Sequence, residues 1–173
     1  FNWNKNIVEG NDALDSSTRI LDMSRIGPIL TYEDEIVRQG PPVTAMLIQN
    51  TNPAAVAPDT HRVLRGLKRE DLFLCVHEQF MTETAKMADI VLPATTFLEH
   101  DDLYQAAGQM HVQVHRAIID PPGETRSNHW VLSQLAERLG AVHEGFDMTE
   151  WELVDCTLKD SGWPGGEELL ERK

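Results

Sequence analysis

Three short apolar segments organise the first half of the chain. Residues 43–49 (VTAMLIQ) and 72–76 (LFLCV) are almost uninterrupted apolar runs, bounded by prolines and polar residues. Runs of this length and composition are typical of strands that are buried on both faces. A third segment, 90–92 (IVL), is closed by a proline. We therefore expect three buried strands.

Helix signals separate these strands. Asp59 is suited to cap a helix that runs to about Leu67, and Thr82 is suited to cap a shorter helix to about Ala88. The resulting order is β-α-β-α-β. Strands that alternate with helices predict right-handed crossovers and an α/β fold with an open, parallel, doubly wound, Rossmann-like sheet.

Further helices flank this order. Thr31 and Thr149 each stand three positions before an acidic residue, which is the spacing of a capping box, and Gly140 is suited to end a helix. Residues 111–116 alternate in polarity, which fits either an added strand or an extended arm. Helices are predicted over 18–24, 32–38, 127–139 and 150–160, with a charged helix or tail at 167–173.

The chain of 173 residues is long enough for about one core. We divide it into an irregular and helical lead-in (1–40), an α/β domain portion (41–140) and a helical extension (141–173). Phe1 stands in place of a starting methionine, and no secretory leader pattern follows it. We expect that a segment upstream has been removed.

The charge balance restricts the choice of partner. The chain has 15 Lys and Arg against 28 Asp and Glu, so its formal net charge is −13. This charge opposes binding to the phosphate backbone of DNA or RNA. No apolar run approaches the roughly 18 to 20 residues that span a bilayer. We therefore expect neither nucleic-acid binding nor membrane insertion.

The loops that follow the first two strands are the first candidates for a binding site, because ligands of open parallel sheets bind beyond the carboxyl ends of the strands. After the first strand, Asn50, Thr51, Asn52 and Pro53 supply amide and hydroxyl groups on a rigid turn. His77 with Glu78, at the exit of the second strand, can hydrogen-bond a base or a ribose. Neither loop carries a GxGxxG or Walker motif, and a plain turn is the alternative interpretation.

Other chemistry is weakly supported. Residues 99–102 (EHDD) lie on an extended chain, whose consecutive side chains point to opposite faces, and the pattern around His111 and His115 favours a strand over the helix that a zinc site would need. We expect Cys75 and Cys156 to be buried, reduced thiols. The sequence gives no catalytic residue and no metal ligand that we would name.

Three stretches of the chain resemble the molybdopterin oxidoreductase family. They are LIQNTNPAAVAPD (47–59), VHEQFMTETAKMADIVLPATTFLEHDD (76–102) and PPGETRSNHWVLSQLAERLG (121–140). The family includes formate dehydrogenases, nitrate reductases and dimethyl sulfoxide reductases, and carries molybdenum or tungsten on two molybdopterin guanine dinucleotides. The similarity covers roughly residues 20–160, which in the family are an internal piece of a much longer chain.

The resemblance implies a site for one of these dinucleotides. The turn formed by Asn50, Thr51, Asn52 and Pro53 matches a family segment that touches the guanosine end, with Asn52 as the strongest candidate. His77 and Glu78 match positions near the same nucleotide. Asn128 matches a position where the family often has Asp or Asn near the guanine. Replacement of Asn52 by alanine is expected to weaken nucleotide binding with little loss of stability.

The resemblance also implies what lies elsewhere. The metal ligand, the amino-terminal iron-sulfur segment and the carboxy-terminal dinucleotide cap of the family belong to other parts of the parent chain. The chain alone is then expected to be inactive, with the rest of the parent enzyme and electron-transfer subunits as partners, in the cytoplasm or the periplasm. The alternative is a free-standing α/β module that binds a nucleotide or a partner subunit and has no redox activity.

Overall fold

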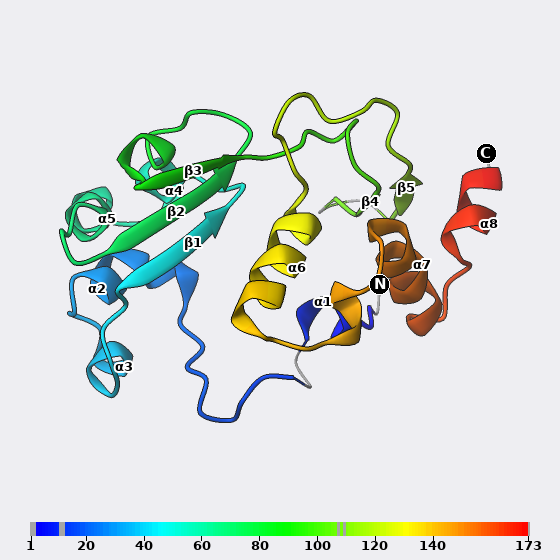
Figure 1. Cartoon of the computed structure of the whole chain (residues 1–173). Coiled ribbons are helices and arrows are strands. Elements are labelled where there is room, and N and C mark those ends of the chain that lie inside the picture. Colours follow the sequence, from blue (N-terminus) through cyan, green and yellow to red (C-terminus); the bar gives the residue numbers. More distant parts are fainter. Residues whose placement is uncertain (1–2, 11–12, 107, 109, 173) are drawn as a thin grey trace. The chain divides into compact units, whose positions relative to one another are not determined.

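The computed structural model describes residues 3–10, 13–106, 108 and 110–172. The chain forms two compact units, coloured along the sequence in Figure 1. Residues 18–94 make up the first, which we call the sheet unit. Residues 1–17 and 95–173 make up the second, which we call the helical unit. The boundaries predicted at residues 40 and 140 stay predictions.

The sheet unit is built on three parallel strands. They are β1 (Ala45–Gln49), β2 (Phe73–Glu78) and β3 (Ile90–Pro93), and β2 lies between the other two (Figure 1). The order β1-β2-β3 follows the chain, with helical segments in both connections. The α/β fold class with a parallel sheet and flanking helices is therefore confirmed.

The second strand is longer than the sequence indicates. We expected it to end at Val76, but His77 and Glu78 continue it, because both are paired with β3 in register with Leu92 and Pro93. His77 also pairs with Gln49 of β1. Pairing with β3, and for His77 also with β1, keeps these polar residues extended.

The strands are buried mainly on one face. Leu74 and Val76 are almost fully buried, whereas Phe73 and Ile90 keep 49 and 44% of their surface exposed. Cys75, on the same face as Phe73, is unpaired and only partly buried, as is Cys156. The expectation that the strands are buried on both faces is therefore wrong. The expectation that the thiols of Cys75 and Cys156 are buried is wrong as well. A right-handed crossover that always moves in one direction places its helices on one face of the sheet.

Two helices of the sheet unit have the caps that the sequence predicts. Asp59 caps α5 (Thr60–Leu67) by accepting a hydrogen bond from the backbone N–H of Arg62, and Thr82 accepts one from Ala85 at the start of η2 (Ala85–Met87). Four other short helical segments complete the sheet unit. They are η1 (Met23–Arg25), α2 (Ile26–Leu30) and α3 (Glu35–Arg38) before β1, and α4 (Pro53–Val56) between β1 and α5. Neither α2 nor α4 is predicted from the sequence.

The predicted helices at 18–24 and 32–38 are found only in part, since η1 begins at Met23 and α3 begins at Glu35, and tertiary contacts account for the difference. Thr31 follows the last residue of α2, and its hydroxyl donates to the carbonyl of Gly27. Its side chain therefore does not cap the start of the next helix. The buried carboxylate of Asp34 lies 2.9 Å from the guanidinium of Arg25. A charge that is removed from water needs such a partner, and this requirement overrides the capping box.

The core of the sheet unit joins the sheet to α2 and α5. It contains buried apolar side chains from both strands and helices, namely Leu30, Ile48, Ala54, Val63, Leu67, Leu72, Leu74, Val76 and Ala85. Gly66 permits the close approach of the two helices, since a Cβ atom at this position would lie 2.4 Å from Cβ of Leu30.

The helical unit contains the two long helices that the sequence predicts. Ser127 caps α6 (Asn128–Leu139), which ends at Gly140 in the left-handed conformation, and Thr149 and Glu152 form a complete capping box on α7 (Glu150–Asp160). A two-stranded antiparallel sheet shows that the segment 111–116 contains an added strand. The other elements are α1 (Asn6–Glu9), β4 (Asp102–Tyr104), β5 (Gln113–His115), η3 (Glu144–Phe146) and α8 (Gly166–Glu171).

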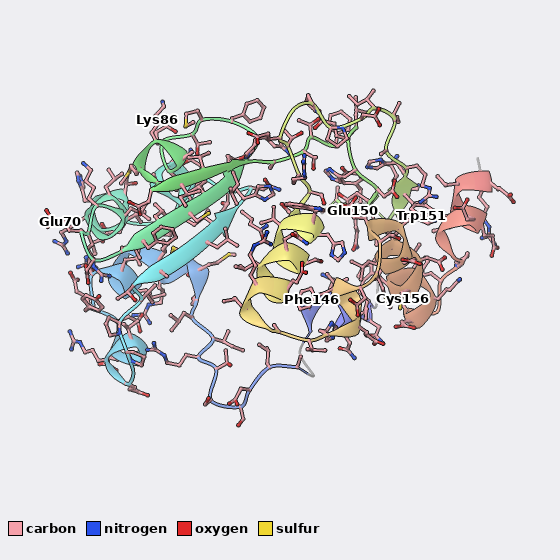
Figure 2. The ribbon with its side chains drawn as sticks, viewed as in Figure 1. Glu70, Lys86, Phe146, Glu150, Trp151 and Cys156 are labelled. Atoms are coloured by element: carbon pink, nitrogen blue, oxygen red, sulfur yellow. The ribbon has the colours of Figure 1, made fainter. Side chains whose placement is uncertain are left out.

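The core of the helical unit is smaller. Trp151, Val154 and Leu158 of α7 are buried, and residues of β4, β5 and α8 pack against them while remaining partly exposed. Figure 2 shows the side chains that line α7. Arg116 lies over the ring of Trp151, with its guanidinium carbon 4.2 Å from the ring centre, and pairs with Asp101 at 2.9 Å.

Candidate functional site

The parallel sheet places the ends of its strands at a common edge. Gln49, Glu78 and Pro93 end the three strands, and the register pairs Gln49 with His77 and Glu78 with Pro93, so all three strand ends lie at one edge. The loops that leave this edge span residues 50–52 and 79–84. The structure therefore brings together the two loops that the sequence selects as candidates, and we call them the edge loops.

A hydrogen-bond network centred on Asn52 joins the edge loops. The Asn52 amide nitrogen donates to the Glu83 carboxylate at 3.0 Å. Its oxygen accepts from the Thr84 hydroxyl at 2.7 Å and from the Thr84 backbone N–H at 3.2 Å. The Thr84 hydroxyl in turn accepts from the backbone N–H of Ala54 at 3.1 Å. Because Thr84 is completely buried, the network fixes one loop against the other.

The rest of the turn after β1 is shaped by its backbone. Asn50 has a φ of 48°, in the left-handed region that Asn tolerates better than most residues. Its N–H donates to the carbonyl of His77 at 2.9 Å. Pro53 is buried at the first position of α4, where a missing N–H costs nothing. The side chains of Asn50 and Thr51 are exposed.

His77 and Glu78 differ in what they offer a ligand. The imidazole of His77 has no exposed surface, and its Nδ1 lies 3.3 Å from the side-chain amide nitrogen of Gln49. These two groups lie within hydrogen-bond distance of each other, so the ring is held against β1 and away from solvent. Glu78 is partly exposed, and its carboxylate accepts a hydrogen bond from the N–H of Gln79 at 2.8 Å.

Asn128 belongs to the other unit. It is the first residue of α6, directly after the cap Ser127, and it is exposed. Its assignment to the same nucleotide stays a prediction from the resemblance.

The electrostatics of the edge loops differ from the sequence expectation. The sequence places Arg62 close to the turn after β1, where its positive charge would offset the net charge of −13. In the structure its guanidinium already pairs with Glu33 at 3.1 Å and Asp59 at 3.3 Å. The hydrogen bond from Asn52 lowers the pKa of Glu83 below its ordinary value of 4.5, and the nearby charge of Lys86 acts in the same direction. Glu83 is therefore an ionised acceptor at neutral pH.

Sequence reasoning missed Glu83 and Thr84. Both lie in the TET run of the second stretch that carries the family resemblance. We assigned only Thr82 a role there, because a helix cap is a local signal. The partner of Thr84 is 32 positions away in the chain, and such a pairing has no local signature.

The helical unit has hollows of its own. Hollows of about 430 and 290 Å³ lie in the helical unit, one near α1 and the end of α7, the other between β5 and α8, and no predicted site residue lines either. Within the described residues, no three His, Cys, Asp or Glu side chains are placed to hold a metal ion together. None of the helices that the structure describes is long and apolar enough to cross a membrane.

Comparison with known protein families decides the classification. Residues 28–138 match the model of the molybdopterin oxidoreductase family, and this segment contains β1, β2, β3 and both edge loops. The chain belongs to the molybdopterin oxidoreductase family. Members of this family are enzymes with a molybdopterin cofactor that carries molybdenum or tungsten.

Curated relatives extend the match beyond the sheet unit. The chain is 41% identical over 154 residues to a probable oxidoreductase, YoaE, of Bacillus subtilis, which covers 88% of the chain. It is 38% identical over 111 residues, 64% of the chain, to the alpha subunit of an F420-dependent formate dehydrogenase of Methanocaldococcus jannaschii. The chain spans only 21 and 16% of the lengths of these relatives.

A solved structure supports the fold. Acetylene hydratase from Pelobacter acetylenicus matches 82% of the chain with a TM-score of 0.63 and 24% sequence identity. The match covers 19% of that enzyme's chain. At 24% identity, this likeness establishes the fold of the chain and nothing about its activity.

Proposed function

We propose that the chain forms part of a larger molybdopterin oxidoreductase and contributes one face of the site for a molybdopterin guanine dinucleotide. The observation that carries the proposal is the pair of edge loops, joined through Asn52 at the carboxyl edge of a parallel sheet in a segment that matches the family. Carboxyl edges of such sheets are where nucleotides bind. The short span of the relatives that the chain covers supports a longer parent.

The donor and acceptor groups at the edge loops fit a guanosine. Exposed Asn50 and Thr51 offer amide and hydroxyl groups to a ribose or a base, and Glu83 offers an ionised carboxylate to N–H donors. His77 is buried and supports the loop through its carbonyl, which accepts from Asn50. Glu78 completes the proposed set on the sheet unit, and Pro53 rigidifies the turn. Asn128 stays a proposed nucleotide contact of the helical unit, on the resemblance to the family alone.

The role of the chain in this proposal is to bind and orient. The cofactor supplies the two-electron redox chemistry, and the protein supplies position and electrostatics. We place the metal ligand and any iron-sulfur cluster in other segments of the parent chain. Electron-transfer subunits are then partners of the parent enzyme.

The native protein provides the test. An antibody against the chain is used to isolate the protein from its source, and we measure its mass, its molybdenum and tungsten content, and the guanine nucleotide released by acid. We expect a chain several times larger than 19.5 kDa with bound metal and GMP. A metal-free and nucleotide-free protein of 19.5 kDa would favour the free-standing module.

Replacement of Asn52 by alanine tests the site within that protein. The change removes the hydrogen bonds to Glu83 and to buried Thr84, so we expect loss of bound GMP together with a loss of stability of about 1–3 kcal/mol. The structure thereby replaces the expectation of little stability loss. Full retention of GMP in a destabilised variant would contradict the proposed site.

A further inference from the structure

Glu83 combines exposure with a fixed position. Its carboxylate is open to solvent, yet one of its oxygens is held by Asn52, and Asn52 is held by the buried Thr84. An exposed glutamate side chain ordinarily loses considerable rotamer freedom when it binds a ligand. The network has already restricted that freedom, so the carboxylate is preorganised for hydrogen-bond donors that approach the edge loops.

Asn52, in contrast, has little capacity left for a ligand. A side-chain amide offers two N–H donors and an oxygen with two lone pairs. The Asn52 oxygen accepts twice from Thr84, and one of the two N–H groups donates to Glu83. One N–H group remains. Asn52 is thus better suited to position Glu83 than to recognise a base by itself.

We propose that Glu83 recognises the guanine base of the nucleotide, and that Asn52 is the positioning residue for Glu83. The inference rests on the proposed function, since it names the group that distinguishes guanine from other bases. The N1–H and exocyclic N2–H groups of guanine point in the same direction and can donate together to the two oxygens of one carboxylate. Adenine presents a lone pair at N1, which a carboxylate repels.

Phe80 on the same loop supplies a second element of a base site. Its side chain is 69% exposed, and the backbone around it is held in a tight turn by a hydrogen bond from the N–H of Thr82 to the Phe80 carbonyl at 2.8 Å. Exposed aromatic rings stack on bases without regard to their hydrogen-bonding edge. Phe80 therefore contributes affinity for any base, and Glu83 contributes the choice of guanine.

The test uses the full-length protein without its cofactor and titrates it with GMP and, separately, with AMP by calorimetry. Glu83→Gln keeps the size of the side chain but places an amide N–H against a guanine donor. We expect its affinity for GMP to fall about 10- to 100-fold, as for the loss of a charged hydrogen-bond partner, with no change for AMP. Asn52→Asp keeps the acceptor for Thr84 but sets a carboxylate against Glu83, so it should show the same selective loss.

Two further variants separate recognition from other causes. Glu70→Gln removes one negative charge from the loop before β2, where the side chain points outward (Figure 2), and should leave both affinities unchanged. Phe80→Ala should weaken GMP and AMP equally, by about tenfold. If Glu83→Gln and Glu70→Gln have the same effect, the carboxylate acts only through net charge and the inference is wrong.

The outcomes distinguish this inference from the function on which it rests. Wild-type protein that binds GMP, with Glu83→Gln binding it equally well, overturns the role of Glu83 and leaves the nucleotide site standing. Equal losses for GMP and AMP in Glu83→Gln also overturn it, because recognition requires selectivity. Wild-type protein that binds neither nucleotide and contains none when isolated overturns both proposals.

Discussion

Each of the two compact units of the chain is stabilised by its own kind of contact. In the sheet unit, side chains from β1, β2, α2 and α5 meet in one buried cluster, and Leu30, Val63 and Leu74 have almost no exposed surface. In the helical unit the buried cluster is confined to α7, and large apolar residues such as Leu139 and Val142 remain 74 and 90% exposed.

The difference shows which forces fix each unit. Non-local packing of apolar side chains defines the sheet unit, and several of its polar contacts, such as Asn52 with Glu83 and Arg62 with Glu33, join residues that are distant in sequence. The helical unit relies more on local signals, since Ser127, Gly140 and the Thr149–Glu152 box end its helices by hydrogen bonds within a few residues. The sheet unit should therefore respond most to changes in its core, and the helical unit to changes at its helix ends.

Truncation of a core leucine in each unit should have the largest effect. Leu74→Ala, at the centre of the sheet, is expected to cost about 2–5 kcal/mol, because the rigid surroundings retain the cavity. Leu158→Ala should cost less, because its partly exposed neighbours can move into the space. Hydrogen exchange of the β2 amides measures the loss of stability in Leu74→Ala.

Tryptophan fluorescence measures the loss of stability in Leu158→Ala, since all four tryptophans lie in the helical unit. Equal losses in the two units would contradict the contrast between their cores.

Insertion of a methyl group between α2 and α5 tests how tightly the sheet unit is packed. Gly66→Ala places a Cβ atom 2.4 Å from Cβ of Leu30, so the helices must separate. We expect the free energy of unfolding to fall by about 1–3 kcal/mol, as measured by urea denaturation that is monitored through hydrogen exchange. His61→Ala, on the exposed part of α5, is the control and should change stability by less than about 0.5 kcal/mol. A neutral Gly66→Ala would show that the two helices move apart freely.

Removal of the Thr84 hydroxyl tests the polar connection between the edge loops. Thr84→Val keeps the shape but leaves the N–H of Ala54 buried without its partner, at a cost of about 1–3 kcal/mol. Thr84→Ser retains the hydroxyl and should restore the network. Chemical denaturation gives the stability of each variant. If serine is as destabilising as valine, the methyl group rather than the hydrogen bond holds the loops.

The smallest effect concerns the pH dependence of α7. The hydrogen bonds from Thr149 lower the pKa of Glu152 below its ordinary 4.5. A carboxyl group whose pKa is lowered by folding stabilises the folded state above its unfolded pKa, and this contribution is lost as the pH falls through the folded value. Tryptophan fluorescence should therefore report a weaker helical unit below about pH 4. Glu152→Gln should flatten that part of the pH profile, and an unaltered profile would exclude the capping box as its cause.

The sequence by itself determined the features that depend on neighbouring residues. The apolar runs predicted the three strands, and Asp59, Ser127, Gly140 and the Thr149–Glu152 pair marked helix ends correctly, because a cap is formed by residues within about four positions of each other. The two loops selected after β1 and β2 do lie at one edge of the sheet. Parallel pairing makes that result follow from strand order alone.

Only the tertiary structure decided the contacts that cross the chain. It extended β2 through Glu78, because β3 pairs with it, and it turned Asp34 from a helix cap into the partner of Arg25. It also connected Asn52 with Glu83 and Thr84, more than 30 positions away. These pairings form because buried charges and amides must find partners wherever packing places them, and that placement is a property of the folded core.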